Sequence, residues 1–276
     1  MKLLATAGLI FFASAGAQAS TVFGLDASNN LIAFDSAAPT TTLFSTRITG
    51  TTETFRAIDF RPFNNILYGL STSNTLYTIN TASGLASAVG GPLSLSGTQF
   101  GFDFNPTIDR IRVVSNTGAN YVLNPDTGAL QLTATNINGI DGASVAGNAY
   151  TSSTFGAPAA STQLYALDVA NNLLATQNNN GGTLVARGPL GVDIGEGASF
   201  DIAGTDAFVQ NGADFYSVDL ASGALTRIGQ TDRSLVGIAI SAVPEPATWA
   251  MMLAGFGAAG AAIRRKRKPG GAPTYA

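Results

Sequence analysis

Short stretches of alternating hydrophobic and polar residues recur at even spacing along most of this chain. Two segments nearly copy each other: "VFGLDASNNLIAFD", which begins at Val22, and "LYALDVANNLLATQ", which begins at Leu164. Each contains two apolar stretches separated by an Asn-Asn pair, a pattern typical of two strands joined by a turn. Helical periodicity is missing between residues 20 and 242, so this part of the chain is predicted to be all-β.

Further themes order the strands into a repeating unit of four. First strands resemble "RAIDFRP", which ends at Pro62, and "GFDFNP", which ends at Pro106, 44 residues later. Second strands resemble "ILYGLS", third strands "TLYTIN" and fourth strands "ASAVGG", with turns such as "NPDTG" between them. Five such units need about 220 residues, which is the length of the region. We therefore predict a β-propeller of five four-stranded blades. A two-sheet β-sandwich is the alternative, which five sequence copies disfavour.

The strand types at the two ends of the region predict how the ring closes. The region starts at Val22 with a strand of the second type and ends with "LVGIAIS" (235–241), which resembles the first type. We expect residues 235–241 to pair with residues 22–26 and complete the first blade, because a closed ring has no open sheet edge. The segment "TSSTFGAPAAS" (151–161) interrupts the fourth unit and is predicted to be a surface loop.

The N-terminus has the features of a secretory signal peptide. Lys2 precedes an apolar run over residues 3–13, and Ala17 and Ala19 satisfy the small-x-small rule for cleavage. Residues 1–19 are therefore expected to be removed, and a domain spanning residues 20–242 to be exported.

The C-terminal segment, residues 243–268, has the features of a membrane anchor. Residues 247–263 carry no charge and would span about 25 Å as a helix, slightly less than a bilayer core of about 30 Å. Five basic residues at 264–268 follow directly, and the positive-inside rule keeps such a cluster in the cytoplasm. We predict one transmembrane helix, followed by a tail at 269–276. An amphipathic or core helix is the alternative.

The order of parts in this segment resembles a known sorting signal. A Pro-Glu-Pro motif, a short apolar helix and an Arg-rich end resemble the PEP-CTERM signal of Gram-negative bacteria, on residues Pro244, Glu245, Pro246, Arg264, Arg265, Lys266 and Arg267. The resemblance implies processing by an exosortase-like membrane protease and an association with exopolysaccharide or other surface material. The protein would then be anchored transiently in the inner membrane before it reaches the cell surface or the extracellular space.

Composition narrows the chemistry of the exported domain. The chain has no cysteine and no histidine, which removes disulfides, the usual catalytic triads and ordinary zinc sites. All three lysines lie in the sorting segments, so residues 20–243 hold eight arginines against sixteen acidic residues. A net charge of −8 argues against nucleic acid or an anionic membrane as a partner of the domain.

Three aspartates occupy equivalent places in first-type strands: Asp59, Asp103 and Asp201, where the other two units have Ala146 and Ala239. If these strands surround a channel, the carboxylates converge and could bind a hard cation such as Ca²⁺. No other cofactor is expected. In the alternative, each carboxylate bonds to the backbone of its own or a neighbouring blade.

Two arginines form a second candidate site. Arg110 and Arg112 share one face of a strand and could hold a carboxylate or a sulfated sugar. The alternative is an Arg–Asp network that fixes the neighbouring turn.

The middle of the chain also resembles a bacterial family of unknown function. The segments "GTQFGFDFNPTIDRIRVVSNTGANYVLNPDTGAL" (97–130) and "LATQNNNGGTLVARGPLGVD" (174–193) look like domain of unknown function 4394. This resemblance implies no catalytic residues. We expect a non-catalytic binding or structural propeller at the surface or in the matrix. A calcium-dependent hydrolase or lyase that uses the three aspartates is the alternative.

Overall fold

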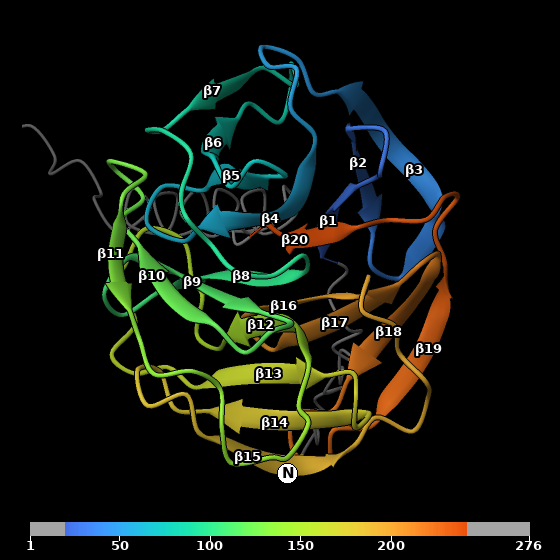
Figure 1. Ribbon diagram of the computed structural model, residues 1–276. Helices are drawn as coiled ribbons and strands as arrows, with labels where there is room; N and C mark the ends of the chain where they lie inside the picture. Colours follow the sequence, from blue (N-terminus) through green and yellow to red (C-terminus); the bar gives the residue numbers. More distant parts are fainter. Residues whose placement is uncertain (1–19, 242–276) are drawn as a thin grey trace, which may run out of the picture.

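The computed structural model describes residues 20–241, which form twenty strands in five antiparallel sheets around a central axis (Figure 1). Each sheet is one blade of four strands. From the axis outward, the strands of blade 1 are β20 (Gly237–Ile240), β1 (Thr21–Leu25), β2 (Asn30–Asp35) and β3 (Ala38–Arg47). Those of blade 2 are β4 (Phe55–Arg61), β5 (Ile66–Ser71), β6 (Leu76–Ile79) and β7 (Ala86–Ala88).

The other three blades follow in chain order. Blade 3 contains β8 (Phe100–Asn105), β9 (Arg110–Ser115), β10 (Asn120–Leu123) and β11 (Leu130–Thr133). Blade 4 contains β12 (Val145–Tyr150), β13 (Leu164–Asp168), β14 (Leu173–Gln177) and β15 (Leu184–Pro189). Blade 5 contains β16 (Ser199–Ala203), β17 (Asp206–Asn211), β18 (Asp214–Val218) and β19 (Leu225–Gln230). The predicted five-bladed β-propeller is confirmed.

Several predictions fall outside the described residues. These are the signal peptide over 1–19 with its cleavage residues, the sorting segment over 243–268 and the tail over 269–276. Within residues 20–241, no helix has the length and hydropathy that crossing a membrane requires.

Asparagine and glycine form the turns because several turn positions need a positive φ. Asn29 and Asn172, in the two Asn-Asn turns, have φ of 62° and 50°, a region that asparagine tolerates better than most residues. Gly128 closes the "NPDTG" turn with φ of 69°. A Cβ at this position would lie 1.4 Å from the Val89 carbonyl oxygen of blade 2. The outer hairpin of blade 3 therefore packs on the preceding blade through a residue that only glycine can supply.

The last strand closes the ring as the order of strand types predicts. β20 pairs antiparallel with β1, and Val22, Phe23 and Gly24 lie opposite Ile240, Ala239 and Ile238. The Val236 amide donates to the Leu25 carbonyl at 2.7 Å, which extends the pairing beyond the strand. The N- and C-terminal parts of the domain thus share one sheet.

Apolar side chains fill the spaces between blades. Between blades 1 and 2, for example, Leu25 and Leu31 belong to the same buried cluster as Ile58, Phe60 and Ala239. Because each cluster draws on two neighbouring blades, no blade buries its apolar faces alone.

The five inner strands, β4, β8, β12, β16 and β20, surround the axis and run along it in the same direction, so the ring has two distinct ends (Figure 1). We call the end at which they begin the mouth and the end at which they finish the base. The loop over 151–163 leaves blade 4 at the base. It contacts two other blades there, because the Gly156 amide donates to the Pro62 carbonyl at 3.0 Å and the Ala159 amide to the Pro106 carbonyl at 3.1 Å. The predicted insertion is therefore a loop that ties three blades together.

Removing the closing strand should destabilise the whole ring. A chain that ends at Arg233 lacks the inner strand of blade 1, and buried residues on β1 and β4 would become exposed. We expect this chain to lose its cooperative thermal transition, whereas a chain that ends at Ala242 should keep it. Both chains would begin at Ser20, and their thermal unfolding would be followed by circular dichroism. Equal melting temperatures would contradict the role of β20.

Candidate metal centre

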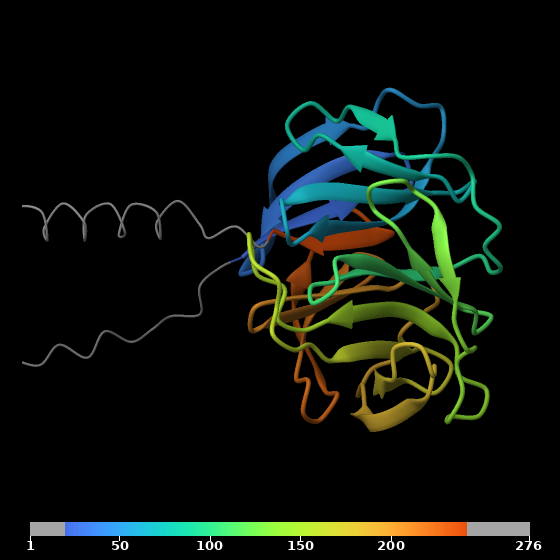
Figure 2. The same ribbon diagram turned by 90° about the vertical axis from the view of Figure 1, so that its left-hand side faces the viewer.

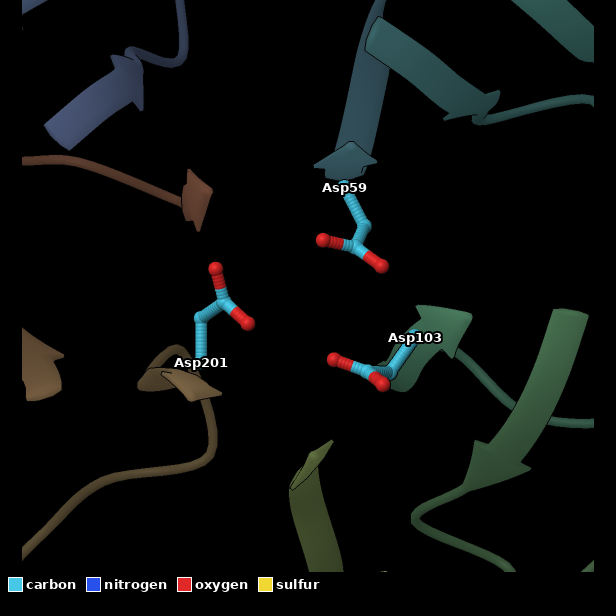
Figure 3. Close-up of side chains that lie close together, drawn as sticks. All are labelled: Asp59, Asp103 and Asp201. Atoms are coloured by element: carbon cyan, nitrogen blue, oxygen red, sulfur yellow. The ribbon is translucent and has the colours of Figure 1, made fainter. Parts of the chain in front are cut away.

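Three carboxylates meet on the axis of the propeller, as the repeat predicts. Asp59, Asp103 and Asp201 lie at equivalent positions of β4, β8 and β16, and their side chains point toward one another (Figure 3). One oxygen from each carboxylate lies within 4.8 Å of the others. All three residues are buried.

The same carboxylates accept hydrogen bonds from backbone amides of the inner strands. Asp59 accepts from Phe60 at 2.7 Å and from Phe104 of blade 3 at 2.8 Å. Asp103 accepts from Tyr150 of blade 4 at 3.0 Å.

Asp201 completes the set. It accepts from Ile202 at 2.6 Å and from Ile240 of blade 1 at 2.5 Å. One amide of each inner strand is thereby satisfied. Three carboxylates supply five acceptor oxygens, and the second oxygen of Asp103 has no backbone donor among these bonds. Bonding to neighbouring blades and convergence on the axis therefore occur together, although the sequence presents them as alternatives.

The structure corrects one position in the repeat. The amide that bonds to Asp59 belongs to Phe104, the residue directly after Asp103. In blade 4 the corresponding amide, which bonds to Asp103, belongs to Tyr150. The residue before it, Ala149 rather than Ala146, is therefore equivalent to the aspartates. The error arises because β12 has no aspartate to mark the register. This strand also lacks the large apolar residue that precedes aspartate elsewhere. Ala239 is placed as predicted.

Burial makes three negative charges costly at this point. Desolvation and the neighbouring carboxylates raise the pKa of Asp59 and of Asp103 well above the usual value, and desolvation raises the pKa of Asp201 to about 6. Within residues 20–241, no ion pair joins these carboxylates to an arginine. The cluster therefore needs either bound protons or a bound cation near neutral pH.

The donor set fits one divalent cation. Ca²⁺ takes oxygen ligands at about 2.3–2.6 Å, so ligands on opposite sides of the ion lie up to about 5 Å apart. Asp59, Asp103 and Asp201 can supply one oxygen each within that limit. Water would have to complete the coordination.

A ring of small residues separates the carboxylates from the mouth. The positions two residues before the aspartates are Ala57, Gly101, Gly147, Ser199 and Gly237. The pocket that they line has a volume of about 20 Å³, space for about one water molecule. A Cβ at Gly147 would lie 2.8 Å from the Cβ of Phe200. Glycine is thus required for the close approach of the inner strands, and only a water-sized species can reach the aspartates from this side.

Asn148 is a buried residue near the centre that the sequence analysis missed. It occupies the position where the other blades have Ile58, Phe102, Phe200 and Ile238. Asn148 is fully buried, and neither of its amide atoms has a hydrogen-bond partner among the described residues. Its oxygen lies 2.1 Å from where a Cβ on Gly101 would stand. A polar residue at an apolar position of the repeat was the available signal, but the wrong register in β12 concealed it.

The two candidate arginines have different environments. Arg112 is buried and donates to Asn120 at 2.9 Å, to Asn180 of blade 4 at 2.9 Å and to the Tyr150 hydroxyl at 3.3 Å. Arg110 is partly exposed and donates to Gln131 at 2.6 Å. Arg112 thus joins two blades, which favours an internal network over a ligand site. The network differs from the predicted one, because the turn aspartate Asp109 pairs with Arg61 of blade 2.

Comparison with known proteins assigns both segments of the chain. The model of a family described as a domain of unknown function, DUF4394, matches residues 30–239. The chain belongs to the DUF4394 family. A PEP-CTERM protein-sorting motif matches residues 242–268. The DUF4394 domain is therefore exported and transiently anchored at the membrane, and its sorting motif implies processing by exosortase-type machinery. No curated protein matches this chain.

Solved structures resemble the DUF4394 domain in fold alone. A crystal structure of a nidogen/laminin complex has 10% identity and a TM-score of 0.52, and the match covers 81% of this chain and 98% of the other. Glutaminyl cyclase of Myxococcus xanthus has 14% identity and a TM-score of 0.43, over 72% and 79% of the two chains. PorZ, a surface component of the type-IX secretion system of Porphyromonas gingivalis, has 14% identity and a TM-score of 0.39, over 78% and 27%.

Without metal, the DUF4394 domain should become less stable as pH rises from about 4 to 7. The folded pKa of Asp201 is about 6, whereas an aspartate in an unfolded chain has a pKa of about 3.9. Between these values the folded state holds a proton that the unfolded state has released, so raising the pH favours unfolding. Deprotonation of Asp201 alone should lower the free energy of unfolding by about 3 kcal/mol across this pH range. Thermal melts in EDTA would measure the trend, and a melting temperature that rises across this range would contradict it.

Asp103→Asn should separate the charge of the cluster from its hydrogen bonds. An asparagine oxygen can still accept from Tyr150, so the variant should melt at a higher temperature than the parent in EDTA at pH 7. Millimolar Ca²⁺ should stabilise the parent, by about 2.7 kcal/mol at 100 times Kd, but not Asp103→Asn. Differential scanning calorimetry would measure both effects.

Two matched variants are controls. Asp59→Asn should be destabilised, because Asp59 accepts two amides and asparagine offers a single oxygen. Asp141→Asn, at an exposed position, should behave like the parent. A calcium effect that survives in Asp103→Asn, or no effect in the parent, would contradict a metal centre on these aspartates.

Proposed function

We propose that this protein is an exported, non-catalytic binding module that holds neutral polysaccharide of the cell surface or matrix at the mouth of its propeller. The observation that supports this proposal is a groove beside the mouth whose lining is rich in hydroxyl and amide side chains. The mouth groove is lined by residues 27–29, 47–56, 72, 74, 97–99 and 236. It has two sections, of about 680 and 450 Å³, which share Ala27 and Thr54.

The chemistry of the mouth groove suits a ligand that carries many hydroxyl groups. Its lining is dominated by hydroxyl and amide side chains: Ser28, Asn29, Thr49, Thr51, Thr52, Thr54, Thr72, Asn74, Thr98 and Gln99. Such groups both donate and accept hydrogen bonds, as sugar hydroxyls do.

The acidic charge of the whole domain, rather than the charges in the mouth groove, favours a neutral sugar over a sulfated one. Arg47 and Arg56 bring positive charge. They are opposed by Glu53, whose pKa is lowered by hydrogen bonds from Ser71 and Ser73, so that it is ionised at neutral pH. The domain as a whole is acidic, which would repel a polyanionic chain.

The central aspartates offer little support for the alternative, a hydrolase or lyase. Carboxylate catalysis requires contact between the side chain and the scissile bond. Asp59, Asp103 and Asp201 are buried behind a pocket of about 20 Å³, which is too small for a sugar ring. We therefore assign the centre a structural role, in which a cation or protons neutralise the axis.

A residue that fills the mouth groove should abolish binding. Thr54→Trp places an indole where the two sections meet, so retention on an array of neutral bacterial polysaccharides should be lost. Thr133→Trp, at an exposed position of outer strand β11, should bind like the parent. Failure of the parent to bind any neutral polysaccharide, or unchanged binding by Thr54→Trp, would contradict the proposal. Release of calcium-dependent cleavage products would instead favour the hydrolase or lyase.

A further inference from the structure

Exposed large hydrophobic side chains are distributed unevenly between the two ends of the propeller. Some lie on outer strands, and Leu85 lies in the turn before β7. Another group lies at the base, in the turns that follow the inner strands of blades 2 and 3 and in the loop over 151–163. We call this group the base patch; it consists of Phe63, Ile66, Ile108 and Phe155. Of the exposed large hydrophobic side chains in residues 20–241, none lies in the loops around the mouth.

The backbone brings the members of the base patch together. The Gly156 amide bonds to the Pro62 carbonyl, which places Phe155 beside Phe63. The Ala159 amide bonds to the Pro106 carbonyl, which brings the same loop to the turn that carries Ile108. The loop over 151–161 contains no charged residue. Phe63 and Ile108 are each more than half exposed, although propeller turns of this kind are usually polar.

The chain leaves the described domain beside the base patch. The Ser241 amide donates to the Thr21 carbonyl at 3.2 Å, and the Asn65 side chain lies 3.4 Å from the Ser241 hydroxyl. Asn65 belongs to the same turn as Phe63. Figure 2 shows the start of the first strand and the loop near residue 155 on the same side of the ring. The last described residue before the sorting segment therefore lies at the base.

The distance from the base to the membrane is short. Five residues, 242–246, separate Ser241 from the uncharged run that begins at Ala247. Even fully extended, they span at most about 18 Å. Before processing, the base is thus held close to the lipid surface, and an apolar patch at that distance reaches the interface region where aromatic side chains are favoured.

We propose that the base patch docks on a zwitterionic bilayer surface while the sorting segment is attached, which holds Pro244–Pro246 at the membrane and turns the mouth away from it. The attraction would be apolar rather than electrostatic, because the domain carries a net charge of −8. Two acidic groups at the base already have partners: Asp109 pairs with Arg61, and Asp206 accepts from the Ser20 hydroxyl. Docking should therefore persist at high salt.

A matched pair of labels can measure which end of the ring contacts lipid. The chain has no cysteine, so Thr107→Cys at the base and Thr98→Cys at the mouth each provide one labelling site. Both positions are exposed and lie beyond opposite ends of β8. The tail-bearing protein, exported in cells without the processing protease, would carry a fluorescent label in phosphatidylcholine nanodiscs at one chain per disc. Brominated lipid should quench the label at 107 and leave the label at 98 unquenched, at low and high salt.

The patch itself is tested by removing its apolar groups. The triple variant Phe63→Asn, Ile108→Asn and Phe155→Asn should lose quenching at 107. A control that combines Leu43→Asn, Leu132→Asn and Val185→Asn, all exposed positions on outer strands, should keep it. Trp249, the single tryptophan of the chain, lies in the sorting segment and reports independently whether the tail stays inserted.

Each outcome bears on the proposal. Equal quenching at 98 and 107, no quenching at either, or quenching at 107 that survives the triple variant with the tail inserted would overturn it. These measurements use no polysaccharide, so their failure would leave the proposed function of the mouth groove unaffected.

Discussion

Closure of the ring by β20 and β1 is the interaction on which the rest of this structure depends. A blade alone is a small four-stranded sheet with two apolar faces, and each face is buried only by a neighbouring blade. A closed ring of five provides two neighbours for every blade. Without β20, blade 1 would lose its inner strand, and β4 and β16 would lose the strand that lies between them. Burial between blades replaces disulfides in an exported chain that has no cysteine.

Closure also explains why three aspartates lie on the axis. The inner strands turn one edge of the backbone toward the centre, and amides there need acceptors. Asp59, Asp103 and Asp201 satisfy five amides, one from each inner strand. Blades 1 and 4 have Ala239 and Ala149 in place of an aspartate. The aspartate of the blade that follows each of them, Asp59 or Asp201, therefore also accepts from the next residue of its own strand. Because each carboxylate has two oxygens, three aspartates are enough to accept from five amides. Their negative charges then lie close together in a buried place, where protons or a cation must neutralise them.

Much of the fold was predictable from the sequence, because repeat length, strand order and turn residues all act locally. The same holds for the convergence of the three aspartates, since equivalent positions in a ring must face the axis. The position of Ala149 was not predictable, because β12 has neither the aspartate nor the large apolar residue before it that mark the register in other inner strands. Asn148 was missed with it. The pairing of Arg112 with Asn180 could not be predicted either, since it joins residues 68 positions apart on different blades.

Antiparallel closure finally gives the two ends of the ring different surroundings. Because β20 and β1 are paired antiparallel, the end of one strand lies next to the start of the other, so both ends of the domain emerge at the base. The connections between blades arrive at the opposite end, and parts of three of them line the mouth groove. The pairing that seals the ring therefore also places Ser241, the last described residue before the sorting segment, and the mouth groove at opposite ends of the domain. The ligand proposed for the mouth groove would therefore not compete for space with the machinery that processes the tail.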